Sequence, residues 1–135
     1  MGELKVGMSA ETSQLVTERD TAATIGSGLV AAYSTPSMIA LMERASVAAI
    51  QPHISEGQTS VGVEVDIKHL AATPVGMQVR ARASLIEIDR NRLRFRVEAW
   101  DEVEKVGEGL HVRALLDRLR FEQQLKRKTG ADGEL

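Results

Sequence analysis

Hydrophobic and polar residues alternate along much of the second half of the chain. Between residues 60 and 69 every second position carries a branched apolar side chain: Val61, Val63, Val65 and Ile67. This period of two predicts a β-strand with one buried face, on which His69 shares the parity of the apolar residues. The same alternation predicts strands over about 77–88 and 92–100, and a weaker pattern over 8–18 predicts a first strand that ends near Val16.

The apolar positions of residues 36–50 follow a different pattern. Thr35 and Pro36 form a typical helix opening, in which a hydroxyl caps free N–H groups and a proline takes the first helical position. The segment that follows is rich in Ala, Leu and Met and ends before Pro52. A helix from about Pro36 to Ile50, apolar almost all round, is expected to be buried.

The order of these elements indicates the fold class. One buried helix precedes several strands joined by short turns at 71–76, 89–91 and 101–104, and residues 105–120 continue as one long strand or two pieces of one. Strands segregated from a single helix predict an α+β fold in which an antiparallel sheet curls round that helix. We interpret residues 1–135 as one domain, with a flexible tail after about residue 127.

Composition narrows the possible chemistry. The 135 residues include no cysteine, which excludes disulfides, thiolate zinc sites and cysteine nucleophiles. The net charge of −2 offers no basic excess for nucleic acid. No apolar run is long enough to cross a membrane, and the first residues lack the apolar core of a signal peptide, so we expect a cytoplasmic protein with no membrane partner. No residue spacing predicts a metal site.

Glu43 lies on an apolar stripe of the predicted helix, between Ile39 and Val47. Burial of an unpaired carboxylate is costly, so its position needs a reason. Three interpretations are open: an edge residue paired with Arg44 or a strand arginine, a buried structural ion pair, or a catalytic base or nucleophile.

Two further residues break the pattern of the strand at 60–69. His69 points toward the helix, either as a satisfied core residue or as a partner of Glu43 in a shared cavity. Gly62 interrupts a valine-rich strand. Such a glycine marks a bulge, close packing against the helix, or a close approach to a ligand whose carbonyl its N–H could bind. Arg113 is a possible anion ligand or a paired arginine. His53 is interpreted as a surface residue, and His111 receives no role.

Three segments carry a family resemblance. Residues 26–46 (GSGLVAAYSTPSMIALMERAS), 59–76 (TSVGVEVDIKHLAATPVG) and 107–117 (GEGLHVRALLD) resemble the hotdog-fold thioesterases of the fluoroacetyl-CoA thioesterase-like group. The resemblance spans roughly residues 5–126. It implies a hotdog fold, assembly as a homodimer or dimer of dimers with sites at the interface, and hydrolysis of a small acyl-CoA thioester without metal or organic cofactor.

The resemblance also assigns residues. It places catalytic roles on Thr35, Glu43 and His69, and substrate-binding roles on Gly62 and Arg113. Glu43 would act as nucleophile or general base, a choice that stays open, and the acyl group stays unassigned because this chain lacks the family's phenylalanine before Thr35. Two other functions stay open: a non-catalytic acyl-CoA or small-ligand binding module, and an enoyl-CoA hydratase or dehydratase.

Spacing shows why a dimer matters for such a site. Thr35 and Glu43 are separated by about 12 Å along a helix, and Gly62 and His69 by roughly 23 Å along a strand. One subunit therefore cannot easily place all four residues side by side. If the strand around Val65 and Asp66 pairs antiparallel with its own copy, Gly62 of one chain approaches His69 of the other.

Overall fold

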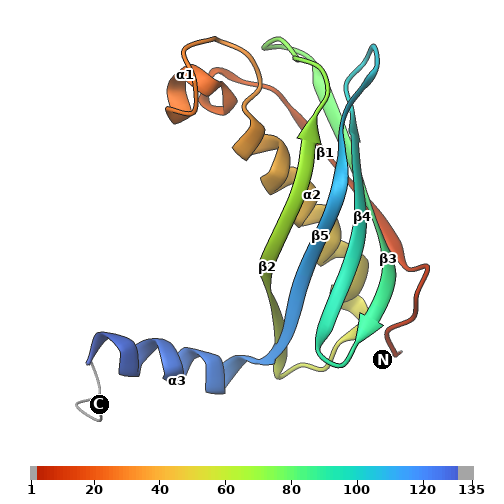
Figure 1. Cartoon of the computed structure of the whole chain (residues 1–135), viewed down its shortest axis with the longest axis vertical. Coiled ribbons are helices and arrows are strands. Elements are labelled where there is room, and N and C mark those ends of the chain that lie inside the picture. Colours follow the sequence, from red (N-terminus) through yellow and green to blue (C-terminus); the bar gives the residue numbers. More distant parts are fainter. Residues whose placement is uncertain (1–2, 131–135) are drawn as a thin grey trace.

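The computed structural model describes residues 3–130, which form one curved sheet around one long helix (Figure 1). The sheet has the order β1-β3-β4-β5-β2, and all neighbouring strands are antiparallel. Its strands are β1 (Ser9–Leu15), β2 (Gln58–His69), β3 (Gln78–Asp89), β4 (Arg92–Trp100) and β5 (Lys105–Asp117). The α+β prediction of a hotdog-like sheet around a central helix is confirmed.

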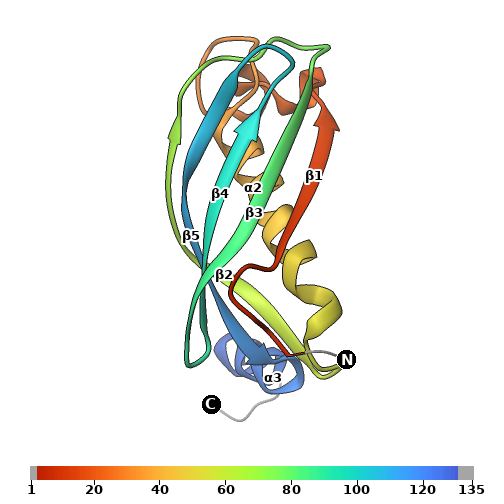
Figure 2. The same ribbon diagram turned by 90° about the vertical axis from the view of Figure 1, so that its right-hand side faces the viewer.

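Three helices complete the described part of the chain: the short α1 (Ala22–Ile25), the long α2 (Thr35–Ile50) and the last helix, α3 (Arg118–Thr129). Single 3₁₀ turns, η1 (Glu18–Asp20) and η2 (Gln51–His53), stand before α1 and after α2. Figure 2 shows α2 running along one face of the sheet. The helix lies mainly against β1 and β3 and also touches β4 and β2.

The core lies between α2 and the central strands. The inward residues of β3 and β4 have no exposed surface, and they are Val79, Ala81, Ala83, Leu85, Leu93, Phe95, Val97 and Ala99. From the helix, Met38, Leu41, Met42 and Ala45 are equally buried against them. The buried phase that the alternation predicted for β3 and β4 is therefore confirmed.

Two features of the helical regions differ from the sequence interpretation. Thr35 is not the N-cap of α2: Ser34 is, and its hydroxyl accepts a hydrogen bond from the N–H of Ser37. The predicted strand does not continue to residue 120, because residues 118–129 form α3. Residues 131–135, which make up most of the tail expected to be flexible, lie outside the described residues. Asp117 caps α3 by accepting from the N–H of Arg120, which explains why the strand ends there.

The strand β2 differs from the prediction of a buried face. It lies at one edge of the sheet, and Val63 and Val65 are 48% and 47% exposed. A bulge also interrupts its pairing with β5 between Gly62 and Glu64. Because a bulge inserts one residue, the parity of the strand changes there, and Val61 does not share a face with Val65.

The helix α2 is likewise covered on one side only. Ile39, Ala40 and Val47 are half-buried and Ala48 is exposed, although the sequence predicted burial all round. A single sheet touches one face of a helix, so this apolar stripe stays accessible in one chain. Within residues 3–130, no helix is both long and apolar enough to span a membrane.

Candidate active site

The first turn of α2 presents the Thr35 hydroxyl to the end of β2. Because Ser34 performs the capping, the Thr35 side chain is free for another partner. Its Oγ1 lies 2.7 Å from Nδ1 of His69. We call Thr35 and His69 the hydroxyl–imidazole pair.

The other nitrogen of His69 has no partner in the described chain. Nε2 is buried and makes no hydrogen bond. Burial lowers the pKa of the imidazole below its usual value, which favours the neutral ring near pH 7. A shallow cavity of about 390 Å³ lies beside it, lined by Tyr33, His69, Leu70, Ala71 and Ala72. A neutral imidazole with one unused nitrogen is suited to proton transfer.

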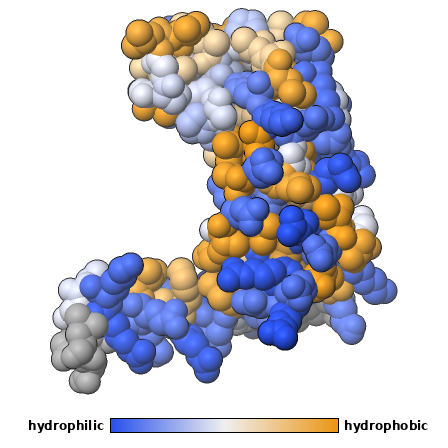
Figure 3. Space-filling model, viewed as in Figure 1, coloured by the Kyte–Doolittle hydropathy of each residue, from blue (hydrophilic) through white to orange (hydrophobic). Residues whose placement is uncertain are grey.

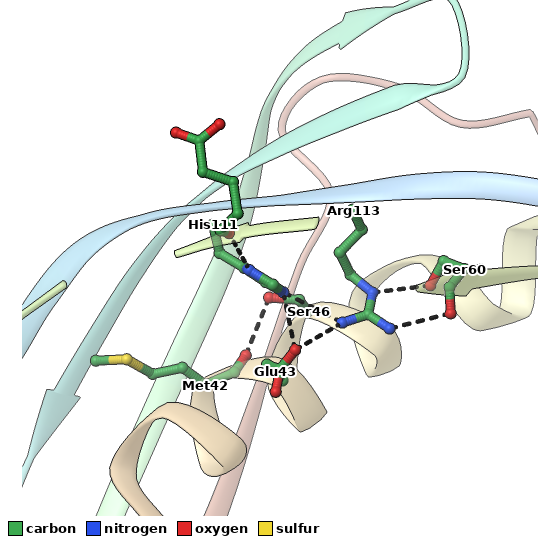
Figure 4. Close-up of polar contacts among 7 residues, drawn as sticks. Met42, Glu43, Ser46, Ser60, His111 and Arg113 are labelled. Atoms are coloured by element: carbon green, nitrogen blue, oxygen red, sulfur yellow. Dashed lines mark hydrogen bonds and ion pairs between the residues drawn. The ribbon is translucent and has the colours of Figure 1, made fainter. Parts of the chain in front are cut away.

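The middle of α2 presents Glu43 to β2 and β5 (Figure 4). The Arg113 Nη1 atom is 3.3 Å from Glu43 Oε2, and His111 Nε2 is 3.6 Å from the same oxygen. Arg113 also donates from Nε to the Ser60 hydroxyl at 2.8 Å and from Nη2 to the Ser60 carbonyl at 3.1 Å. We call Glu43, Ser60, Gly62, His111 and Arg113 the carboxylate cluster.

His111 has a defined protonation pattern in this cluster. Its Nδ1 is 2.9 Å from the carbonyl oxygen of Glu64, which can only accept, so Nδ1 carries the proton. Nε2 then accepts from Arg113 Nη1 at 3.2 Å. The side chain is 1% exposed, and burial lowers its pKa, with the Arg113 charge acting in the same direction. His111 is therefore a neutral acceptor that orients Arg113.

Gly62 is placed so that only glycine fits without movement. A Cβ atom there would lie 2.6 Å from Glu43 Oε2 and 3.2 Å from His111 Cε1. The absent side chain leaves room for the carboxylate. The bulge after Gly62 is essential to this arrangement, because residues 62 and 69 have opposite parity and would otherwise point to opposite faces.

A second cavity opens next to the carboxylate. About 640 Å³ in volume, it lies along the uncovered face of α2 and is lined by Ala40, Glu43, Arg44, Val47, Ala48, Gln51 and Arg113. Its walls are mostly apolar, and its charged residues are Glu43, Arg44 and Arg113, of which Glu43 and Arg113 are paired. Glu43 is 39% exposed at its side chain, whereas Arg113 is 8% exposed. This arrangement suits an uncharged group that must meet a carboxylate.

The structure thus brings the five predicted residues into two groups rather than one. Thr35 meets His69, and Glu43 meets Gly62 and Arg113, while eight helical residues, about 12 Å, separate Thr35 from Glu43. Sequence reasoning missed His111 and Ser60. The sequence did contain a signal for His111, because it shares the parity of Arg113 on β5 and so lies on the same face of the strand. No cluster of three or more His, Asp or Glu side chains suited to a metal occurs within residues 3–130.

The same fold is found in solved thioesterase structures. A mutant of the fluoroacetyl-CoA-specific thioesterase FlK matches with a TM-score of 0.88 at 29% identity, over 95% of this chain and 99% of that one. A Thermus thermophilus hypothetical protein, described as a thioesterase superfamily member, matches with a TM-score of 0.89 at 31% identity, over 99% and 100%. The fold and the similarity to these structures assign the chain to the class of hotdog-fold thioesterases.

Sequence comparison identifies the family within that class. The family model described as fluoroacetyl-CoA-specific thioesterase matches residues 16–119. The fluoroacetyl-CoA thioesterase of Streptantibioticus cattleyicolor is 37% identical over 99 residues, which are 73% of this chain and 71% of that protein. The chain belongs to the fluoroacetyl-CoA-specific thioesterase family and is a thioester hydrolase, as the resemblance predicted.

Proposed function

We propose that the protein hydrolyses a small acyl-CoA thioester to the free acid and CoA, with Glu43 as the group that starts the reaction. One observation carries this assignment: a half-exposed carboxylate stands in a largely apolar cavity, fixed by Arg113. A module that only bound acyl-CoA would have no need of a carboxylate beside the acyl group. Family membership supports the thioester substrate.

The chemical step follows from these groups. Hydrolysis adds a water oxygen to the thioester carbonyl carbon, breaks the C–S bond and delivers a proton to the CoA sulfur. Glu43 either takes the proton from that water or attacks the carbonyl itself and is released by water afterwards. In this proposal the Gly62 N–H polarises the carbonyl, and His69 hands a proton to sulfur from Nε2, which has no partner in the described chain.

Arg113 acts in this proposal by holding Glu43 rather than by binding the CoA phosphates. Its guanidinium is 8% exposed, and its donors are directed to Ser60, His111 and Glu43. A phosphate would have to break these bonds to reach it. Thr35 positions His69 through the bond between its hydroxyl and Nδ1.

The complete site requires two copies of the chain. The edge strand β2 leaves one side unpaired, with Val63 and Val65 exposed. Antiparallel pairing of two copies about Val65 and Asp66 places Gly62 of one protomer opposite His69 of the partner subunit. The carboxylate cluster of one chain then faces the hydroxyl–imidazole pair of the other. We place this dimer in the cytoplasm, in keeping with its CoA substrate.

Thiol release tests the reaction. The wild type is assayed with a thiol reagent across short-chain, branched and aryl acyl-CoAs, beside Glu43→Gln. We expect one or more acyl-CoAs to release thiol and Glu43→Gln to lower kcat by about 10²–10⁴-fold. Saturable CoA binding without thiol release would establish the binding module instead, and hydration of an enoyl-CoA without thiol release would establish the hydratase.

Subunit mixing tests the shared site. Inactive Glu43→Gln and His69→Ala dimers are mixed under conditions that allow exchange. Each mixed dimer contains one site in which Glu43 and His69 are both intact, so random exchange restores about one quarter of wild-type activity. A mixture that exchanges subunits, as mass spectrometry reports, yet stays inactive would show that each site lies within one chain.

A further inference from the structure

The terminal helix α3 extends away from the rest of its own chain. Figure 1 shows it leaving the end of β5 and passing beyond the edge strand β2, at the end of the sheet opposite α1. The Arg118 N–H donates to the Gly57 carbonyl at 3.0 Å, which fixes the direction in which α3 leaves. Along the rest of its length α3 is mostly exposed, and no residue of it is buried.

Such a helix needs packing from outside its own chain. An isolated helix of 12 residues is marginal in water, because nucleation costs more than its few hydrogen bonds return. Leu119 and Leu125 are 68% and 51% exposed, so α3 offers apolar surface for that packing.

A second exposed apolar surface lies at the other end of the molecule. Its members belong to α1, to the loop before α2 and to the segment directly after β2. We call them the apical patch: Ile25, Leu29, Val30 and Leu70. Leu29 is 97% exposed and Val30 67%. The Tyr33 N–H donates to the Thr73 carbonyl, which ties this loop to the segment that follows β2. Figure 3 shows the hollow between α3 and this end of the molecule.

A two-fold dimer through β2 brings these two surfaces together. Pairing centred on Val65 and Asp66 places Gln58 opposite about residue 73 of the partner. Gln58 is also the neighbour of Asp117, the N-cap of α3. The helix therefore begins beside the partner's loop at 70–74. It is about 18 Å long and strands are about 4.8 Å apart, so it reaches past the partner's edge strand.

Charge favours a second copy of this chain as the occupant. Five basic side chains and one acidic side chain give α3 a net charge of +4. The chain as a whole carries −2, which leaves −6 on the remaining residues. The basic helix of one protomer therefore meets a body of opposite charge, an arrangement that steers association.

From these observations we propose that α3 of each protomer packs on the apical patch of the other and forms an outer wall of the cavity beside the partner's hydroxyl–imidazole pair. This inference rests on the dimer of the proposed function. It adds a second contact between the protomers, remote from the β2 edge, and gives α3 a role in the partner's site.

Cross-linking tests the contact directly, because the native chain has no cysteine. A Leu29→Cys/Leu125→Cys variant is treated with a short flexible bismaleimide. Figure 1 places α1 and α3 at opposite ends of one chain, so a link between the two thiols joins two chains. A Val103→Cys/Leu125→Cys variant is the control, because Val103 is 72% exposed in the β4–β5 turn at the same end as α1.

We expect covalent dimer from the first variant and only background from the control. A second measurement uses Leu119→Glu/Leu125→Glu, which should weaken the dimer about tenfold or more in sedimentation. Leu15→Glu, on the far edge strand β1, should leave it unchanged. Absence of cross-linked dimer, or an unweakened dimer, overturns the role of α3. The subunit-mixing experiment still restores activity in that case if the proposed shared site is correct.

Discussion

The two parts of the candidate site differ in how fully their polar atoms are satisfied. In the carboxylate cluster, Arg113 bonds Ser60 and Glu43, and His111 bonds both Arg113 and the Glu64 carbonyl. In the hydroxyl–imidazole pair one bond joins Thr35 to His69, and His69 Nε2 is buried without a partner. The carboxylate cluster thus finds its hydrogen-bond partners within one chain, whereas the hydroxyl–imidazole pair leaves one buried nitrogen without a partner.

This difference separates two tasks. A network in which each member has partners holds a carboxylate in one orientation, which is what a reacting group requires. A buried nitrogen without a partner carries a cost, and it persists where a ligand or another subunit completes it. The carboxylate cluster therefore holds the Glu43 carboxylate in place. In the hydroxyl–imidazole pair, His69 Nε2 stays available to a substrate or to another subunit.

The largest effect on activity is expected from removal of the His69 imidazole, whose Nε2 has no partner. His69→Ala should lower kcat by about 10²–10⁴-fold with little change in KM, because the group moves a proton in the reaction and does not hold the substrate. Thr35→Ser keeps the hydroxyl and is the matched control, with most of the activity retained. A rise in KM alone would assign His69 to binding.

A methyl group at Gly62 should displace Glu43 within the carboxylate cluster while the backbone pairing of β2 with β5 stays intact. The new Cβ would lie 2.6 Å from Glu43 Oε2, so the flexible carboxylate moves and the backbone stays. Gly62→Ala should lower kcat by about 10²-fold, the usual cost of displacing a reacting group by about 1 Å. Gly57→Ala, where no atom lies within 4 Å, should be silent. Equal activity of the two variants would contradict this account.

Removal of the acceptor from His111 should have a smaller effect. His111→Leu takes away the atom that orients Arg113, and one hydrogen bond of about 1 kcal/mol corresponds to a roughly fivefold to tenfold fall in kcat. His111→Gln keeps an acceptor near Nε2 and should recover most of the rate. If both variants lost activity equally while melting at the wild-type temperature, the size of the ring rather than its lone pair would matter.

The smallest expected effect is a change in how the free energy of unfolding depends on pH. Burial lowers the folded-state pKa of His69 and of His111, so between the folded value and the unfolded value of about 6.5 the unfolded chain binds more protons. The free energy of unfolding should therefore be constant just above pH 6.5 and fall as the pH drops below it. His69→Gln/His111→Gln should reduce that fall in urea titrations at pH 7.5 and 5.5. An unchanged slope would show that neither ring is buried as neutral imidazole.

Most of the fold was predictable because it depends on local pattern. Strict alternation located β3 and β4, and the Thr35-Pro36 opening located α2 to within one residue. The end of β5 was missed, because Asp117 indicates a helix cap only when the helix that follows it is known. The family motifs indicated the five candidate residues. Gly62 was a general signal for a bulge, but the sequence did not show that a bulge would turn Gly62 and His69, which have opposite parity, to the same face.

The sequence by itself determined α2 and most of the strands, the apolar stripe along α2, the absence of cysteine chemistry and the resemblance that identified the family. Tertiary structure alone decided which distant residues meet: the fold placed Thr35 beside His69, the bulge turned Gly62 toward Glu43, and β5 brought Arg113 to Glu43. Alternation and helical period are properties of neighbouring residues. Contacts between α2, β2 and β5 join residues 34 to 70 positions apart, whose distance depends on how the sheet closes on the helix.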